Sequence, residues 1–243
     1  MPPVPDTDRD ALVEPPGDGR VFTWRASVGL GDTTPAGRVR LDAIAGWLQD
    51  AAYFDLVDVE LEDRGIWVMR RMRLRVERFP RVGEIIELRT FCSAAGSLAA
   101  ERRTTLESAG GLVESVATWV FLDTETGRPQ RLGPEFDEVY WPSAAGRRAR
   151  ISLRHGPPPD NGERLDWRFR VADLDVADHV NNAAYLAVAE EFLSRDEPGG
   201  LDLEIEFRDP AQAGQAVVIR DGGSVWVTAA DGTLHASIAG LPG

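Results

Sequence analysis

The chain has 243 residues, of which 43% are hydrophobic and 28% charged, a composition typical of a globular protein with a sizeable core. Its formal net charge is −13, and all 27 of its Lys and Arg positions are arginine. Nucleic-acid binding needs clustered positive charge, so this balance argues against a nucleic-acid binder, and it disfavours attraction to an anionic membrane.

Cysteine use and hydropathy indicate the compartment. Cys92 is the single cysteine and lies in an apolar run over 85–92, so we interpret it as a buried structural thiol rather than a nucleophile. No apolar stretch approaches the roughly 20 residues that span a bilayer. The first 20 residues carry neither a signal peptide nor a transit peptide pattern. We therefore expect a disordered tail over 1–20 in a cytoplasmic protein.

The first half of the chain predicts a strand, a helix and four more strands. Apolar residues at helical spacing, among them Leu41, Ile44 and Leu48, predict an amphipathic helix over 41–56. The strands are predicted over 21–28, 69–79, 84–92, 98–108 and 112–123, and the last four look antiparallel. A polar, glycine-rich loop over 29–37 separates the first strand from the helix.

Arginines alternate with apolar residues in the strand over 69–79. Met72, Leu74 and Val76 would face the core, and the intervening arginines would form a charged outer face. Two interpretations of this face remain open: a solvated sheet surface, or a basic patch that docks an acidic partner. The basic residues concerned are Arg70, Arg71, Arg73, Arg75 and Arg78, with Arg147, Arg148 and Arg150 later in the chain.

The second half repeats the plan of the first. The stretch 124–165, which includes Pro157-Pro158-Pro159, is expected to be a linker with some local structure. After it we predict a strand over 166–171, a helix over 182–195 and strands over 201–208, 216–220, 224–228 and 233–238. This order predicts a duplication in which each half packs one helix on an antiparallel sheet, and the two sheets can join edge to edge.

One tryptophan near the start of each half gives a register for the repeat. Placing Trp24 on Trp167 is a shift of 143 residues (167 − 24 = 143). This shift places Asp32 on Asp175 and Ala36 on His179. The first half would then lack the histidine that the second half keeps.

The segment from Asp173 to Asn182, Asp-Leu-Asp-Val-Ala-Asp-His-Val-Asn-Asn, resembles the acyl-ACP thioesterases, the double hot-dog enzymes of plants and bacteria. Tyr185 and Glu191 belong to the same likeness. In the first half it extends to 66–68, 76–80, 94–96, 118–120 and 124–128. The likeness covers roughly 20–220, nearly the whole chain.

The resemblance implies an α+β fold, a tandem double hot-dog, and hydrolysis of a fatty acyl chain from the phosphopantetheine arm of acyl carrier protein. It implies an N-terminal hot-dog over 21–123 that shapes the acyl pocket, the linker over 124–165, and a catalytic C-terminal hot-dog over 166–243. A fused pair satisfies the pairing that single hot-dogs reach by dimerising. We expect a monomer or homodimer.

Thioester hydrolysis needs an attacking oxygen, stabilisation of an oxyanion, and a proton for the departing thiolate. Asp175 would activate water or attack directly, and His179 would orient or protonate. A helix that starts near Asn182 would offer free N–H groups to the oxyanion. This chemistry requires neither a metal nor a cofactor.

Each of these residues also has a structural interpretation. Asp175 could cap a turn, and His179 could pack at the start of the helix. We favour N-capping for Asn181 and Asn182 over catalysis. Glu191 falls on the second helix, where it would face either a polar pocket or solvent.

The segment departs from the family pattern at two places. Ala177 stands where the family has Asn, and it cannot hydrogen-bond through its side chain. Pro210 and Ala211 stand where plant members have Glu and Cys. Asp178 or Asp209 could compensate. These departures keep two alternatives open, an acyl-CoA thioesterase and a non-catalytic acyl-binding hot-dog protein.

Overall fold

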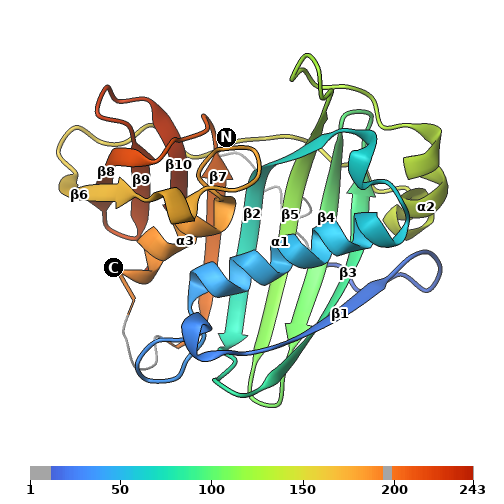
Figure 1. Ribbon diagram of the computed structural model, residues 1–243, viewed down its shortest axis with the longest axis horizontal. Coiled ribbons are helices and arrows are strands. Elements are labelled where there is room, and N and C mark those ends of the chain that lie inside the picture. Colours follow the sequence, from blue (N-terminus) through green and yellow to red (C-terminus); the bar gives the residue numbers. More distant parts are fainter. Residues whose placement is uncertain (1–11, 194–198, 243) are drawn as a thin grey trace, which may run out of the picture.

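The computed structural model describes residues 12–193 and 199–242, and its centre is one ten-stranded antiparallel sheet (Figure 1). The strands are β1 (Phe22–Ser27), β2 (Ile66–Arg78), β3 (Ile85–Ala95), β4 (Ala99–Glu107), β5 (Leu112–Leu122), β6 (Glu163–Phe169), β7 (Leu201–Phe207), β8 (Gly214–Asp221), β9 (Ser224–Thr228) and β10 (Leu234–Ala239). The helices are α1 (Leu41–Asp58), α2 (Pro134–Ala144) and α3 (Asn182–Glu190), with single 3-10 turns at Leu30–Asp32, Glu62–Arg64 and Val171–Asp173. Every predicted strand is confirmed, the one over 224–228 at both ends and the others with ends that differ from the prediction.

The strand order shows the duplication directly. The sheet runs β1-β3-β4-β5-β2-β7-β10-β9-β8-β6, so each half contributes five strands in the same internal order. The two halves meet where β2 pairs antiparallel with β7, with Met72 opposite Ile205 and Leu74 opposite Leu203. The predicted repeat and the predicted edge-to-edge joining are both confirmed.

The register of the repeat differs from the predicted shift of 143. The 3-10 turns of the two halves begin at Leu30 and Val171, a shift of 141 (171 − 30 = 141). At that shift Arg38, and not Ala36, occupies the position of His179. The tryptophan alignment was wrong by two residues, because a strand with period two presents the same face after a slip of two.

The turns that follow these 3-10 segments confirm the new register. In the first half the Thr34 N–H donates to the Arg38 carbonyl at 2.8 Å, and in the second the Asp175 N–H donates to the His179 carbonyl at 2.9 Å. Gly37 (φ 79°) and Asp178 (φ 59°) hold the same left-handed position. Asp32 therefore matches Asp173, and Asp175 matches Thr34.

One hydrophobic core runs through both halves beneath α1 and α3. The predicted stripe of Leu41, Ile44 and Leu48 packs against the sheet, where Met72 and Leu74 of β2 are at most 1% exposed. Burial of each such side chain contributes about 1.5–3 kcal/mol. The core is therefore continuous across the β2–β7 junction.

The outer face of β2 is not simply solvated. Arg73 makes a bidentate ion pair with Asp202 of β7, at 2.8 and 2.6 Å, and Arg71 lies 3.6 Å from Glu204. The linker crosses this face, and the backbone N–H groups of its Arg154 and His155 donate to the buried Glu206. Arg71 and Arg73 therefore pair the two halves along their junction.

A second, smaller core lies between β3 and α2, a helix that falls within the predicted linker. There Asp55 of α1 is fully buried between Arg102 at 2.7 Å and Arg20 at 2.6 Å, and the Tyr140 hydroxyl donates to its carbonyl at 3.3 Å. The predicted disordered tail over 1–20 lies partly outside the described residues. The prediction of disorder is wrong for its last residue, Arg20, because ion pairs hold this side chain in place.

The second helix is shorter than its prediction over 182–195. It ends at Glu190, and Glu191 is its exposed C-terminal cap. Residues 194 and 195 of the prediction lie outside the described residues. In the described part of the chain, no helix combines the length and the apolar character needed to cross a bilayer.

We predict that Asp55→Asn lowers the free energy of unfolding by about 3 kcal/mol, because it removes the charge of a fully buried carboxylate that pairs with two partly buried guanidinium groups. The control is Glu87→Gln, which removes the partner of the exposed Arg25 and is expected to cost less than about 1 kcal/mol. Urea unfolding of both variants measures the difference. Equal losses would contradict the structural role of Asp55.

We predict that the Cys92 thiol does not react with iodoacetamide in the native protein at pH 8. The thiol is buried in β3, and this burial raises its pKa to about 12, so the reactive thiolate is scarce. The measurement is the alkylated fraction by mass spectrometry, with the urea-unfolded protein as control. Rapid native alkylation would show that β3 is accessible.

Candidate active site

The predicted site lies on a tight turn between the Val171–Asp173 3-10 turn and α3. An isolated bridge between Leu174 and Val180 closes this turn, and the Asp178 N–H donates to the Asp175 carbonyl at 3.0 Å. With the bond between the Asp175 N–H and the His179 carbonyl, the backbones of these two residues face each other across the turn. The structure therefore places the backbones of Asp175 and His179 next to each other at the base of one turn.

The Asp175 side chain is partly buried, and its carboxylate is engaged on one side only. Its Oδ1 accepts the Ala177 N–H at 2.9 Å, which confirms the interpretation of Asp175 as a residue that caps its own turn. Within the described residues, Oδ2 receives no hydrogen bond. One carboxylate oxygen is thus fixed by the turn, and the other is available for chemistry.

The start of α3 lies directly after His179. Asn181 is the N-cap and its side chain accepts the Ala183 N–H at 2.8 Å, which confirms the predicted cap. The same prediction is wrong for Asn182, which is the first helical residue and whose Nδ2 donates to Oε1 of Gln49 at 3.4 Å. The Asn182 backbone N–H pairs with no acceptor in the described part of the chain, so it suits a developing negative charge.

The turn also positions the remaining predicted residues. His179 is half-buried, and its ring makes no hydrogen bond with any described residue. Asp178 is exposed at the left-handed corner, and no contact joins its side chain to Asp175. Hydrogen bonds from Arg170, which outweigh the opposing effect of burial, hold the pKa of Asp173 below its usual range. Asp173 therefore stays ionised and braces the base of the turn.

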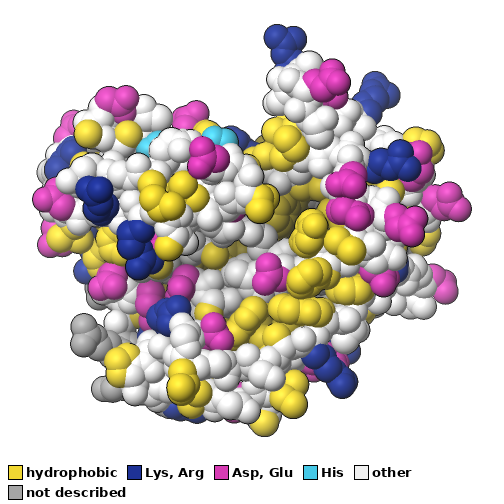
Figure 2. All heavy atoms as spheres, viewed as in Figure 1, with side chains coloured by type: hydrophobic (Ala, Val, Ile, Leu, Met, Phe, Trp, Pro, Cys, Tyr) yellow, Lys and Arg dark blue, Asp and Glu magenta, His cyan; other side chains and the backbone are white. Residues whose placement is uncertain are grey.

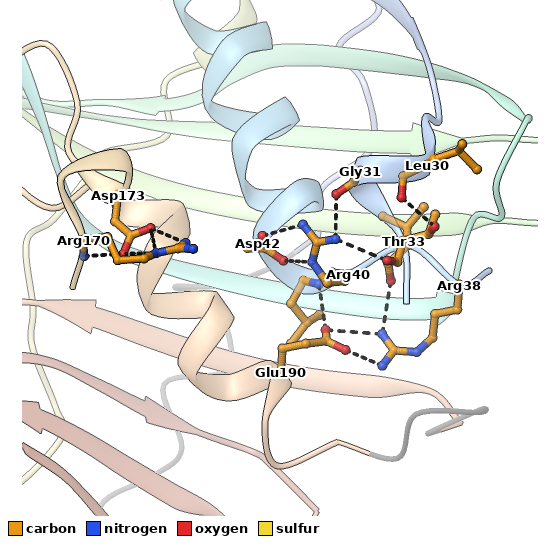
Figure 3. A network of polar contacts seen from close by, with 11 residues as sticks. Leu30, Gly31, Thr33, Arg38, Arg40, Asp42, Arg170, Asp173 and Glu190 are labelled. Atoms are coloured by element: carbon orange, nitrogen blue, oxygen red, sulfur yellow. Dashed lines mark hydrogen bonds and ion pairs between the residues drawn. The ribbon is translucent and has the colours of Figure 1, made fainter. Parts of the chain in front are cut away.

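Of the two neighbouring acids at the end of α3, Glu191 faces solvent, one of its two predicted alternatives, and Glu190 is the partly buried acid that makes polar contacts (Figure 3). It forms an ion pair with the fully buried Arg38, and its Oε2 accepts the Leu41 N–H at the start of α1 at 2.9 Å. The Arg38 guanidinium also lies 4.8 Å from the centre of the Phe79 ring. Glu191 is exposed at the far end of α3 from the turn.

Sequence reasoning missed Arg38, Glu190 and Gln49. A signal for them exists at the shift of 141. The segments 32–41 and 173–182 then share three identical residues, namely Asp32 with Asp173, Ala36 with Ala177, and Val39 with Val180. That match would have made Arg38 the repeat equivalent of His179, and Gln49 the repeat equivalent of Glu190.

The stretch that departs from the family lies beside the turn. The Val180 N–H donates to the carbonyl of the buried Ala211 at 2.9 Å, so positions 210 and 211 adjoin the site but supply no acid. Asp209 is exposed, and its carbonyl lies 3.0 Å from Nδ1 of His235, a histidine that the sequence analysis did not single out. No contact in the described residues brings the Asp209 carboxylate to Asp175.

Figure 2 shows a hollow on the face that carries α1 and α3, with hydrophobic side chains gathered along it. The helix α1 exposes Tyr53, Phe54 and Val57. Desolvation raises the pKa of Asp50, next in the chain to Gln49. The site turn therefore adjoins an apolar surface that belongs to the first half.

A cavity of about 180 Å³ opens further along the first half. It lies between the end of α1, the strands β2 and β5, and α2. Its apolar lining consists of Leu56, Leu61, Trp67, Phe121, Leu132 and Phe136. Trp67 packs on Phe121 at 4.9 Å between ring centres, and Trp119 packs on the main core, so both predicted core tryptophans do pack in the core.

A group of potential metal ligands, His155, Glu204 and Glu206, lies on the opposite face of the sheet. Glu206 already accepts two backbone N–H groups and a hydrogen bond from Arg208 at 3.2 Å. Nδ1 of His155 is 2.9 Å from the Ser237 hydroxyl. These contacts hold the linker to β7 and β10, and the group has no part in the site.

Comparison with known proteins agrees with this arrangement. The acyl-ACP thioesterase N-terminal domain matches residues 19–140, and the C-terminal domain matches residues 157–234. The uncharacterized protein Rv2001 of Mycobacterium tuberculosis is 26% identical over 214 residues, 86% of each chain. Oleoyl-acyl carrier protein thioesterase 1 of Arabidopsis thaliana is 25% identical over 195 residues, which are 73% of this chain and 53% of that protein.

The fold also agrees with a solved structure. The 12:0-ACP thioesterase from Umbellularia californica superposes with a TM-score of 0.72 at 18% identity, over 91% of this chain and 96% of that one. The described sheet, with α1 and α3 packed on one face, is the double hot-dog that the sequence predicted. Since both family domains match in order and together span most of the chain, the protein belongs to the acyl-ACP thioesterase family and is a thioester hydrolase.

Proposed function

We propose that the protein hydrolyses fatty acyl-ACP thioesters to free fatty acid and holo-ACP in fatty acid biosynthesis. The observation that carries this proposal is the turn that holds Asp175 opposite His179 and leads directly into the N-terminus of α3. We place this activity in the cytoplasm. Of a monomer and a homodimer, we propose the monomer, since the β2–β7 junction already pairs two hot-dogs within one chain.

The geometry supports a division of roles within the turn. Asp175 uses its free Oδ2 to activate water or to attack the thioester carbonyl, while Oδ1 stays bound to the Ala177 N–H. His179 protonates the departing thiolate. The Asn182 N–H, at the positive end of α3, stabilises the oxyanion. Burial raises the pKa of Tyr185 beneath the turn, so its hydroxyl stays neutral and acts as packing.

The first half supplies the apolar surface that a fatty acyl chain requires. The exposed side chains of α1 begin close to Gln49, which contacts Asn182. Leu56, which lines the cavity, is seven residues further along α1, or about 10 Å at the rise of an α-helix. We propose that the acyl chain follows α1 from the site toward this cavity.

The carrier protein does not dock on the arginines of β2 in this proposal. Arg71 and Arg73 are committed to Glu204 and Asp202, so they offer little free positive charge. Exposed arginines of the linker, such as Arg150, remain available for an acidic partner. Competition between acyl-ACP and acyl-CoA at equal concentration separates the proposal from an acyl-CoA thioesterase.

A non-catalytic acyl-binding role is the second candidate, and Ala177 favours it. In the structure this residue is exposed and contributes only its backbone N–H to the turn. A side chain that the family uses beside Asp and His is therefore missing from the site. Tight binding of an acyl chain without turnover would support this candidate.

We predict that Asp175→Asn and His179→Ala each lower kcat on a panel of acyl-ACPs by about 10²- to 10⁴-fold, because each removes a general acid or base. The matched control is Glu191→Gln, which changes an exposed acid at the other end of α3 and leaves kcat within about twofold of wild type. Free fatty acid release measures the rates and gives the chain-length preference. Equal rates for all variants, or no release by wild type, would reject the proposal.

We predict that Ala177→Asn raises kcat by about tenfold without loss of stability, because position 177 is exposed and its backbone contact to Asp175 is retained. Its control is Val176→Asn, which places the same amide on the fully exposed neighbour and leaves kcat unchanged. An acyl-binding protein that gains no turnover from Asn at 177 would favour the non-catalytic candidate.

A further inference from the structure

The repeat places Gln49 of α1 at the position that Glu190 holds on α3. The helices begin at Leu41 and Asn182, 141 residues apart, and the same shift relates Gln49 to Glu190 (190 − 141 = 49). The buried faces agree in this register, with Ile44 matching Tyr185. Each of the two residues lies opposite the N-terminus of the other half's helix, since Gln49 contacts Asn182 and Glu190 contacts Leu41.

At the start of α1, a carboxylate accepts the first N–H of the helix, so that this N–H is not available to another ligand. Glu190 accepts the Leu41 N–H at 2.9 Å, the first N–H of α1, and also pairs with Arg38 (Figure 3). Arg38 stands where the second half has His179. A negatively charged oxygen therefore occupies the place on α1 that corresponds to the proposed oxyanion position on α3.

In the second half, the corresponding group is a neutral amide. Gln49 is half-buried, and its Oε1 accepts from Asn182 Nδ2 at 3.4 Å. Because the amide oxygen accepts from the Asn182 side chain, the Nε2 group remains as a donor, and it makes no hydrogen bond with a described residue. A neutral donor leaves the first N–H of α3 available to a substrate, whereas a carboxylate at this position would bind it.

We propose that Gln49, contributed by the first half, binds the thioester carbonyl oxygen and its oxyanion through Nε2, together with the Asn182 N–H. The inference rests on the proposed hydrolysis of acyl-ACP. Because the bond to the oxygen strengthens as charge develops, the contribution of Gln49 falls on kcat more than on KM. At this one position the two halves differ: Glu190 makes a structural contact with the start of α1, and Gln49 makes a functional contact at the start of α3.

Three variants test the inference with acyl-ACP hydrolysis and thermal unfolding. Gln49→Ala is expected to lower kcat by about 10²-fold with KM and Tm nearly unchanged, as for loss of one oxyanion donor. Gln49→Glu reproduces the arrangement at the start of α1, so it abolishes turnover at neutral pH and raises Tm by about 2 °C as the carboxylate binds the start of α3. Activity of Gln49→Glu rises as the pH falls and the new carboxyl becomes protonated.

The matched control is Glu190→Gln, the same chemical change in the opposite direction at the equivalent position. It is expected to lower Tm by about 10 °C, because Arg38 loses its buried partner, with kcat within about twofold of wild type. Wild-type rates in Gln49→Ala, or a fall in Tm that accounts for its lost activity, would overturn the role of Gln49 and leave the proposed function intact. Absence of hydrolysis by wild type would overturn both.

Discussion

The antiparallel pairing of β2 with β7 is the constraint on which the site depends. It places α1 and α3 antiparallel on one face of a continuous sheet, so the start of α3 meets the middle of α1 and the start of α1 meets the last residue of α3. On the opposite face, Arg73 and Asp202 pair across the same junction. A loosened junction would separate Gln49 from Asn182, and the second half would keep its turn but lose the contact from the first.

The two halves retain one geometry and put it to different uses. Glu190 binds Arg38 and the start of α1, and these contacts compensate the desolvation of a buried charge. At the start of α3, by contrast, the chain leaves an N–H group and a half-buried histidine without partners among the described residues. Unmet hydrogen-bonding capacity in an otherwise satisfied fold is typical of a position that meets a ligand. The duplication thus supplies an internal comparison of a closed site with an open one.

The local pattern of apolar and polar residues predicted most of the fold and the position of the site. It failed where contacts between residues distant in the sequence determine the structure. Period two in Met72 and Leu74, and helical spacing in Leu41 and Ile44, report burial directly. The period of two in a strand also concealed the register of the repeat, because a slip of two residues leaves the Trp24 side chain on the same face of the sheet. Glu190 and Glu191 are adjacent and chemically identical, and only the end of α3 and the position of Arg38 distinguish them.

The loss of a polar side chain at position 177 does not loosen the turn. Asp175 is held by the backbone N–H of Ala177 and by the His179 carbonyl, and neither bond depends on the side chain at 177. What the substitution removes is a group that could touch substrate. Gln49 brings an amide to the same helix terminus from the other half of the molecule, at a position where its repeat equivalent is a committed carboxylate. Polar groups for the reaction can thus come from α1, while the turn itself supplies the carboxylate and the imidazole.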